Sequence, residues 1–217
     1  MFRRSTEAAR GPLGVELASP SLYNDPMHGE TETGAAAVHL APFLLSDAHV
    51  ARLVHWFRDP DVARFYREEP QPEHVRAKFG PRTRPESRVK ARLIQAEDVW
   101  VGYAQFYLLD ADEIRAMALP AEPSSWGGFD LFIGEGEWRG RGLGRRVVRL
   151  LLHELFRVGA TDAAIDCDRE NAAGLKAYEA AGLTIVRLLP AWSRGRDHWL
   201  LTGPTETAAV HAGGRGA

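Results

Sequence analysis

The spacing of apolar residues along this chain predicts strands in some stretches and helices in others. The sharpest change of period follows the short apolar run FDLFI (129–133), which gives way to a polar turn and then to an amphipathic segment. Apolar residues of that segment recur at steps of three and four, as on the buried face of a helix: Leu143, Val147, Leu150, Leu151, Leu155 and Phe156. A strand, a turn and a helix are therefore expected in this order.

Turn and cap residues delimit further elements on both sides of this unit. Strands are expected where apolar and β-branched residues lie between turn signals: 38–43, 89–96, 99–109, 163–166, 184–189 and 198–202. Helices are expected where caps precede helical spacing: after Ser46-Asp47, after Asp59-Pro60, from Pro72 to about Phe79, and from Asn171 to Gly182. Residues 110–126 are expected to form a long acidic loop without secondary structure.

The two ends of the chain differ in composition from the middle. Residues 1–35 carry Gly, Pro, Ser, Glu and Thr without apolar periodicity, and the end of the chain from Pro204 is similar. Such segments cannot bury enough apolar surface to fold. We therefore expect a disordered arm at 1–35, one domain at 36–203 and a flexible tail at 204–217.

Composition narrows the classes of protein that the chain can belong to. Hydrophobic residues make up 45% of 217 positions, enough for a real core, and the net charge of −2 argues against a nucleic-acid partner. The single cysteine, Cys167, excludes an internal disulfide and suits a reducing cytoplasm. No apolar run approaches the ~18 residues of a membrane span. The histidines show no ligand spacing with carboxylates, so no metal is expected.

The turn before the long helix has the composition of a phosphate-binding loop. In Arg139-Gly140-Arg141-Gly142-Leu143-Gly144 the glycines let backbone N–H groups approach a ligand, and they lead into a helix N-terminus that favours anions. The Gly-Lys-Ser/Thr ending of a nucleoside-triphosphate loop is absent. The spacing also fails the G-x-G-x-x-G dinucleotide pattern.

The loop does fit R-x-x-G-x-G, read at Arg139, Gly142 and Gly144, and a second signature follows it. Asn171 precedes Tyr178 by seven residues on a helix that ends at Gly182. Together these resemble the GCN5-related N-acetyltransferase (GNAT) superfamily. The resemblance implies an α/β (α+β) fold, with a central mixed, mostly antiparallel sheet whose strands splay and whose faces carry helices.

The same resemblance implies acetyl-CoA as co-substrate. The residues that would bind it lie at the end of the strand, in the loop and at the second helix: Leu131, Phe132, Ile133, Arg139, Gly140, Arg141, Gly142, Leu143, Gly144, Arg145 and Asn171. Asn171 would bind the pantetheine arm, cap its own helix, or do both.

Three stretches narrow the resemblance to aminoglycoside 6′-N-acetyltransferases. Residues 101–107, VGYAQFY, are similar to a strand of that family, Asp130 matches its strand aspartate, and Asp166 precedes Asn171 by five residues as in its D-P-x-x-x-N segment. The chain departs from the family at Cys167, where the family has Pro, at 173–176, and at 65–67, where a Trp- and Gly-rich segment is replaced. These departures leave the expected chemistry intact and affect the identity of the acceptor.

The chemistry expected of an amine acetyltransferase assigns two roles. An ammonium group must lose a proton before it attacks a thioester, and Asp130, in an apolar strand that raises its pKa, is the expected base. The resemblance assigns proton donation to Tyr178, and a backbone N–H near 131–133 is expected to stabilise the oxyanion. The alternatives are an Asp130 paired with an arginine and a Tyr178 that only packs in the core.

A cationic acceptor requires an acidic site. Between Glu97 and Glu137 the charged residues are acids apart from Arg115, whereas bases crowd 139–149, and this segregation suggests two substrates of opposite charge. The residues expected to bind the acceptor combine acids with aromatic rings that either stack on sugars or pack in the core: Tyr66, Glu68, Glu69, Trp126 and Asp166.

The expected partner is therefore a small-molecule amine, foremost an aminoglycoside, and neither a nucleic acid nor a membrane. Three alternatives stay open. The chain also resembles acyltransferases of hydroxylysine in siderophore assembly and, around Ile133-Gly134-Glu135, N-terminal acetyltransferases of ribosomal proteins. A catalytically inactive CoA-binding module is the third, and the presence of Asp130, Asn171 and Tyr178 argues against it. Monomer and dimer are equally compatible with the sequence.

Overall fold

The chain divides into two units, residues 1–35 and 36–217. The computed structural model describes residues 37–121 and 125–206, all of them in the second unit. The predicted arm at 1–35 lies outside the described residues, as does the predicted tail from residue 207 on.

Strands and helices follow one another closely along the described chain. The strands are β1 (Val38–Pro42), β2 (Lys90–Ala96), β3 (Val99–Leu108), β4 (Trp126–Ile133), β5 (Asp162–Asp168), β6 (Thr184–Ser193) and β7 (Arg196–Pro204). The α-helices are α1 (Asp47–Phe57), α2 (Pro60–Tyr66), α3 (Pro72–Phe79), α4 (Ala111–Ala116), α5 (Leu143–Arg157) and α6 (Ala172–Ala180). Two short 3₁₀ helices are η1 (Gly80–Thr83) and η2 (Gly136–Trp138).

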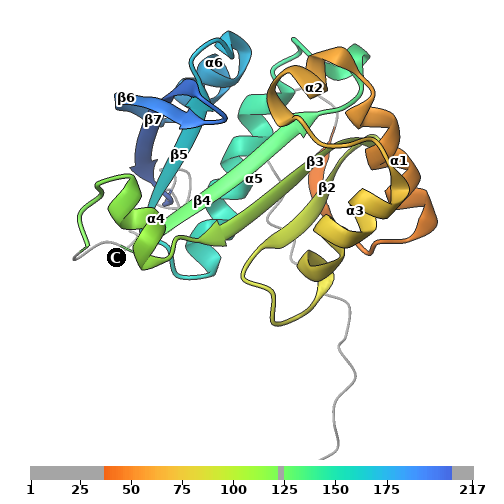
Figure 1. The fold of residues 1–217 in the computed structure, drawn as a ribbon, viewed down its shortest axis with the longest axis horizontal. Helices are drawn as coiled ribbons and strands as arrows, with labels where there is room; N and C mark the ends of the chain where they lie inside the picture. The colour runs from red at the N-terminus through yellow and green to blue at the C-terminus, as the bar shows by residue number, and fades with distance from the viewer. Residues whose placement is uncertain (1–36, 122–124, 207–217) are drawn as a thin grey trace, which may run out of the picture. The chain divides into compact units, whose positions relative to one another are not determined.

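The strands form one mixed sheet in the order β1-β2-β3-β4-β5-β7-β6 (Figure 1). Neighbouring strands are antiparallel except for β4 and β5, which are parallel and pair only at Trp126 with Asp162 and at Gly127 with Ala163. Beyond Gly127 the two strands separate. The predicted mixed, mostly antiparallel sheet with splayed strands is therefore confirmed.

Helices cover both faces of this sheet. On one face α5 and α6 bury the largest apolar cluster, which includes Val147, Leu151 and Phe129. On the other face α1–α3 cover β2 and β3 with a cluster rich in aromatic residues, while α4 covers the opposite end with Leu109, Met117 and Trp126. On this second face, α3 and α4 lie at different ends of the strands in the middle of the sheet (Figure 1).

The predicted caps and turns account for most element boundaries. The side chains of Ser46, Asp59 and Asn171 each accept a backbone N–H at the start of their helices. Gly182 follows α6 with φ +104°, a conformation that glycine adopts without strain. Glu97 and Asp98 both have positive φ, as the tight turn between β2 and β3 requires.

Three expectations need correction. Residues 110–126 contain helix α4, because the Asp110 side chain accepts from the Glu113 N–H and the Glu113 side chain accepts from the Asp110 N–H. Phe156 is 43% exposed, because it lies one residue beyond the buried Leu155 and is turned about 100° away from it. The domain also continues past residue 203, since Thr205 is buried and its hydroxyl donates to the Ala160 carbonyl at 2.6 Å.

The strands β6 and β7 are longer than the predicted 184–189 and 198–202, because residues 190–193 continue β6 and β7 begins at Arg196. Within the described residues, no helix combines the length and the apolar character that crossing a membrane would need.

Candidate active site

The glycine-rich loop ends in an open helix N-terminus. Gly140 and Gly142 have φ values of +72° and +77°, and a Cβ atom added at either would meet nothing within 4 Å. Helix α5 then begins at Leu143 without a side-chain cap, so its first N–H groups depend on an outside acceptor. A backbone cradle of this kind can bind a phosphate or pyrophosphate group. It contains six of the predicted cofactor residues: Gly140, Arg141, Gly142, Leu143, Gly144 and Arg145.

Gly144 has a different reason to be a glycine. A Cβ atom at Gly144 would lie 3.2 Å from the Cβ atom of Ala177, so the absence of a side chain lets α5 approach α6 closely. The loop thus joins the two helices that carry the two sequence signatures.

Arg139 occupies a structural position in this loop. Its guanidinium binds Asp59 at 2.7 Å and Asp61 at 2.8 Å, and it also donates to the carbonyls of Ile133 and Gly134, both at 2.9 Å. Although burial opposes ionisation of Asp59, the bonds from Arg139 hold the pKa of that carboxyl below its ordinary value. The Arg139 side chain therefore ties the end of β4 to the start of α2.

The separation of β4 from β5 exposes backbone groups of β4. In the β3–β4 ladder the even-numbered residues of β4 bond to β3, as the bonds Leu109 N–H to Trp126 and Gly134 N–H to Val101 show. The N–H groups of Leu131 and Ile133 therefore face the gap that β5 leaves. They are available to a carbonyl oxygen placed in that gap.

Phe132, also predicted to bind the cofactor, points elsewhere. Its backbone belongs to the β3 ladder, opposite Tyr103, and its ring lies in the aromatic cluster, 5.8 Å from the Trp56 ring. Asn171 caps α6, because its Oδ1 accepts from the Gly174 N–H at 3.0 Å. The capping half of the prediction for Asn171 is thereby confirmed.

Asp130 lies on the open face of β4, partly exposed to the surface. Burial of its carboxyl group, with a further contribution from the nearby Asp166, raises its pKa to about 6, against the hydrogen bond from Gln105 and the charge of Arg82. Gln105 Nε2 donates to Asp130 Oδ2 at 2.7 Å. A carboxylate of this kind is ionised at neutral pH and can still take up a proton.

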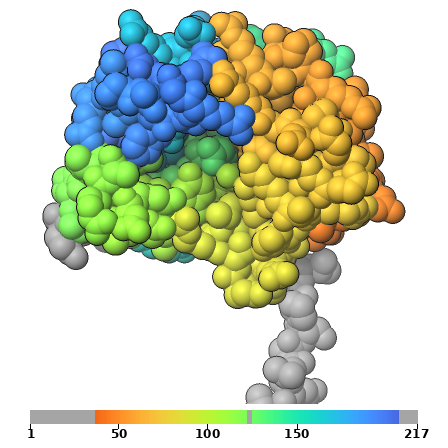
Figure 2. All heavy atoms as spheres, in the orientation of Figure 1, coloured from red at the N-terminus to blue at the C-terminus, as the bar shows by residue number. Residues whose placement is uncertain are grey.

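Figure 2 shows a hollow on this face of the molecule. The β6–β7 region, α4 and the segment around α3 and η1 surround it, and the strands in the middle of the sheet form its floor. Asp130, Gln105 and Tyr107 share this face of the sheet, since Gln105 and Tyr107 stand opposite even-numbered residues of β4.

Tyr178 approaches the gap from the other face of the sheet. It is 8% exposed, and its ring meets that of Phe129 edge-on at 5.8 Å. Burial raises its pKa well above the ordinary value, and Cys167, Asp130 and Asp166 add to the rise. The hydroxyl therefore keeps its proton at neutral pH and lies in the electrostatic range of both carboxylates. Packing in the core and proton donation are compatible here.

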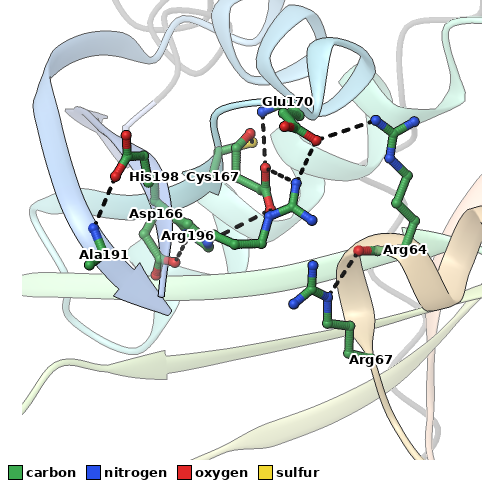
Figure 3. Close-up of polar contacts among 10 residues, drawn as sticks. Arg64, Arg67, Asp166, Cys167, Glu170, Ala191, Arg196 and His198 are labelled. Carbon is green, nitrogen blue, oxygen red and sulfur yellow. Dashed lines mark hydrogen bonds and ion pairs between the residues drawn. The ribbon is translucent and has the colours of Figure 1, made fainter. Parts of the chain in front are cut away.

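Asp166 lies on β5 across the gap from Asp130 and has a partner that sequence reasoning missed. His198 Nδ1 is 2.8 Å from Asp166 Oδ2 (Figure 3). His198 stands opposite Asp168 in the β5–β7 ladder, so that the three side chains share the face of the hollow. The sequence shows a histidine in the last strand, but only the pairing of β7 with β5 places this histidine beside Asp166.

A chain of ion pairs continues from this pair to α2 (Figure 3). Arg196 binds the buried Asp168 at 2.8 Å and Glu170 at 2.7 Å, and Glu170 reaches Arg64 at 3.4 Å. Arg194, at the tip of the β6–β7 hairpin, donates to the Arg67 carbonyl at 3.0 Å. The hairpin is thereby fastened to α2 beside the gap between β4 and β5.

The remaining residues predicted to bind the acceptor are largely engaged elsewhere. Trp126 is 8% exposed and donates its indole N–H to the Pro120 carbonyl at 2.7 Å, which is the packing alternative. Tyr66 stacks on Phe57 at 5.9 Å. Glu68 binds Lys78 at 2.6 Å and His74 at 2.8 Å. Glu69 is exposed at the surface.

Several acids of the stretch 97–137 bind protein groups outside the hollow. Asp110 and Glu113 cap α4 and bind Arg88, and Glu135 accepts from Arg52 and Trp56. Glu122 lies outside the described residues. Four of the nine acids between Glu97 and Glu137 thus bind cationic groups near them: Asp110, Asp112, Glu113 and Glu135. The carboxylates of the site are Asp130 and two residues of β5.

Comparison with known proteins identifies the class. Residues 46–190 match the family model described as "Acetyltransferase (GNAT) domain". The match spans more than half of the chain, so the chain belongs to the GNAT acetyltransferase family. The family predicted from the two signatures is confirmed.

Solved structures of other acetyltransferases share this fold. Aminoglycoside acetyltransferase AAC(6′)-Ib, in complex with coenzyme A, is 19% identical with a TM-score of 0.64, and the alignment covers 77% of this chain and 95% of that one. Spermidine N-acetyltransferase from Vibrio cholerae, in complex with CoA and spermine, is 12% identical with a TM-score of 0.61, covering 77% and 95%. An aminoglycoside N(6′)-acetyltransferase from Legionella pneumophila is 12% identical with a TM-score of 0.59, covering 77% and 92%. At these identities the likeness shows the fold.

Proposed function

We propose that this acetyltransferase moves the acetyl group of acetyl-CoA to a primary amine of a cationic small molecule, foremost the 6′-amine of an aminoglycoside. Asp130 serves as general base and Tyr178 as general acid. The observation that carries the proposal is the carboxyl of Asp130, with a pKa of about 6, on β4 beyond the point where β4 stops pairing with β5.

Acetyl-CoA supplies an activated acetyl thioester when bound. In this proposal the loop at 140–145 and the N-terminus of α5 hold its phosphates, while the N–H groups of Leu131 and Ile133 bind the carbonyl oxygen. Oxyanion donors of this kind are commonly worth about 3 kcal/mol in the transition state.

The chain's own groups then handle two protons. Asp130 takes a proton from the acceptor ammonium, directly or through one water, since its pKa lets it be ionised above about pH 6 and protonated afterwards. Tyr178, protonated at neutral pH, donates a proton to the leaving sulfur. The second proton that the nitrogen loses as the amide forms then restores the Tyr178 hydroxyl. Asp166, fixed by His198, presents a second carboxylate for a cationic acceptor.

The resemblance of 101–107, Asp130 and Asp166 to aminoglycoside 6′-N-acetyltransferases supports a sugar acceptor, and so do the carboxylates of Asp130 and Asp166. One observation favours a smaller acceptor. Trp126 is packed in the core and one face of the Tyr66 ring is covered by Phe57, so the two rings predicted to stack on a sugar have protein partners. A linear amine of the hydroxylysine type is therefore the second candidate.

A single assay separates these candidates. Release of free thiol from acetyl-CoA is measured at neutral pH with kanamycin, tobramycin, a 6′-hydroxyl aminoglycoside, hydroxylysine and a ribosomal N-terminal peptide. Turnover with 6′-amino sugars and none with the 6′-hydroxyl sugar is the expected result. Turnover with hydroxylysine alone would move the proposal to the second candidate, and turnover with the peptide alone would reject both.

A further inference from the structure

The hydrogen bonds of Gln105 connect Asp130 to a cation that lies far away in the sequence. Gln105 is 8% exposed and stands directly opposite Asp130 in the β3–β4 ladder. Its Nε2 donates to Asp130 Oδ2 at 2.7 Å. Its Oε1 accepts from the Tyr103 hydroxyl at 3.0 Å and from Nη1 of Arg82.

The chemistry of Arg82 fixes which way the amide points. An arginine guanidinium can only donate hydrogen bonds, so the end of the Gln105 amide that faces it must be the oxygen. The end that faces Asp130 must then be the NH₂ group. A rotated amide would set a carbonyl oxygen against a carboxylate and an NH₂ group against a guanidinium, and both contacts are repulsive.

Arg82 is itself held in place. Its guanidinium carbon lies 4.5 Å from the centroid of the Phe79 ring, and a second contact joins Nη1 to the Tyr103 hydroxyl at 3.4 Å. Phe79 is the last residue of α3 and Arg82 belongs to η1. Helix α3 and the turn η1 thus place the Arg82 guanidinium beside β3, the strand that carries Gln105 and pairs with the strand of Asp130.

We propose that Arg82 and Gln105 are positioning residues for Asp130. Arg82 locks the Gln105 amide, and Gln105 in turn keeps the carboxylate ionised and in one orientation. The proposal rests on the role of Asp130 as base in the proposed function, but its physical content is a property of the free protein.

The surroundings of Asp130 show why such support matters. The charged and titratable groups that act on it or are affected by it come from five elements: Tyr66 of α2, Arg82 of η1, Tyr103 and Tyr107 of β3, Asp166 of β5 and Tyr178 of α6. Burial and Asp166 favour the protonated carboxyl, whereas Gln105, Arg82 and Tyr107 favour the carboxylate. Removing Gln105 or Arg82 therefore raises the pKa of Asp130.

The experiment measures that pKa without any acceptor. The protein is labelled with ¹³C at aspartate side-chain carboxyls, the Asp130 signal is assigned by its loss in Asp130→Asn, and its titration is followed by NMR. The wild-type midpoint is expected near 6. Gln105→Met and Arg82→Met are each expected to raise it by about half a unit to one unit, as loss of one charge-assisted hydrogen bond does.

Four comparisons make the result specific. Arg82→Lys keeps a donor and a charge and should restore most of the shift. Arg84→Met removes an exposed cation two residues away and should leave the midpoint unchanged. His198→Gln removes the contact of His198 with Asp166 and should leave the shift caused by Gln105→Met unchanged. Arg82 acts partly through Gln105. Arg82→Met should therefore shift the midpoint less when it is added to Gln105→Met than when it is made in the wild type.

Two outcomes would overturn the inference. An unchanged midpoint in both Gln105→Met and Arg82→Met would mean that these residues only stabilise the fold. Equal effects of Arg82→Met in both backgrounds would mean that Arg82 acts by charge alone and does not lock the amide. If Asp130→Asn kept full turnover while the midpoints shifted as expected, the positioning would stand and the proposed base would fail.

If Gln105→Met did not fold, the midpoint of Arg82→Met and the pH profile of its steady-state kinetics would still test the positioning role. The acidic limb of kcat/KM should move upward with the NMR midpoint, because both report the free enzyme. A fall in kcat without movement of that limb would contradict the proposal.

Discussion

The two halves of the candidate site are built from different materials. The half that faces the loop at 140–145 uses backbone N–H groups, two glycines of positive φ and a helix N-terminus. The half that faces the hollow uses side chains from α2, η1, β3, β4, β5 and β7. A backbone site needs a short local sequence, whereas a side-chain site needs the whole fold.

This difference explains why the family could be recognised from the sequence and the acceptor could not be fixed. The glycine loop keeps its geometry with few constraints on its neighbours. The side chains of the other half belong to strands and helices that are far apart in the sequence, so no short motif identifies them. Four predictions test how far the contrast holds, from the largest expected effect to the smallest.

The largest effect is expected from Asp130→Asn. An amide cannot accept the proton of the acceptor ammonium, so kcat/KM should fall by about 10²- to 10⁴-fold. In the wild type kcat/KM should decline as the pH drops through about 6, the pKa of the carboxyl. Steady-state kinetics from pH 5 to 9 checks both, with thiol release as the signal. Retention of full turnover by Asp130→Asn would place the base elsewhere.

The same substitution should stabilise the fold at neutral pH. The folded protein raises the pKa of Asp130 from 3.8 to about 6, so the ionised carboxylate is destabilising above pH 6. Below about pH 4 both states are protonated and the variant gains nothing. The gain should grow between pH 4 and 6 and reach about 2–3 kcal/mol above that range. Urea unfolding at pH 4 and pH 7.5 measures this gain. An equal gain at both pH values would show that it does not come from the ionised Asp130 carboxylate.

An intermediate effect is expected from the ion pairs beside the hollow. Arg196→Gln leaves the Asp168 carboxylate, 9% exposed, without its closest cation and should cost about 1–3 kcal/mol of folding free energy. Arg169→Gln is the matched control, because its pair with Asp197 is exposed and 3.6 Å long, and it should cost less than about 1 kcal/mol. Urea unfolding of the two variants checks this, and equal losses would remove the distinction.

Arg196→Gln should also affect the two substrates unequally. The hairpin that it fastens borders the hollow, so the KM of the acceptor should rise more than the KM of acetyl-CoA. Equal changes in the two KM values would indicate a general loss of structure, and the two halves of the site would then not be independent.

The smallest effect is expected at the glycine loop. Gly142→Ala and Gly159→Ala place a Cβ at φ +77° and +93°, and neither Cβ would meet an atom within 4 Å. Each should cost about 1–2 kcal/mol of stability. Only Gly142→Ala should raise the KM of acetyl-CoA, by about three- to tenfold, since a strained loop aims its N–H groups less well. A rise in both, or in neither, would show that the loop does not hold the phosphates.

The local features of the fold were determined by the sequence itself. Caps at Ser46, Asp59 and Asn171, the turn at Glu97-Asp98 and the periodicity from Leu143 to Leu155 each depend on residues a few positions apart, and each has the predicted conformation. The helix α4 obeyed the same local rules, through Asp110 and Glu113. The signal for this helix, an acidic residue followed by a glutamate three positions later, is therefore present in the sequence.

Only the tertiary structure decided which side chains share the site. Nothing near Gln105 in the sequence indicates Arg82 or Asp130 as its partners, and nothing near Asp166 indicates His198. The sequence predicted ligand contacts for three residues that instead bind protein groups: Trp126, Glu68 and Arg139. The physical reason is that strand pairing and helix packing join residues that are distant in the chain, whereas caps, turns and glycine loops are fixed by neighbours.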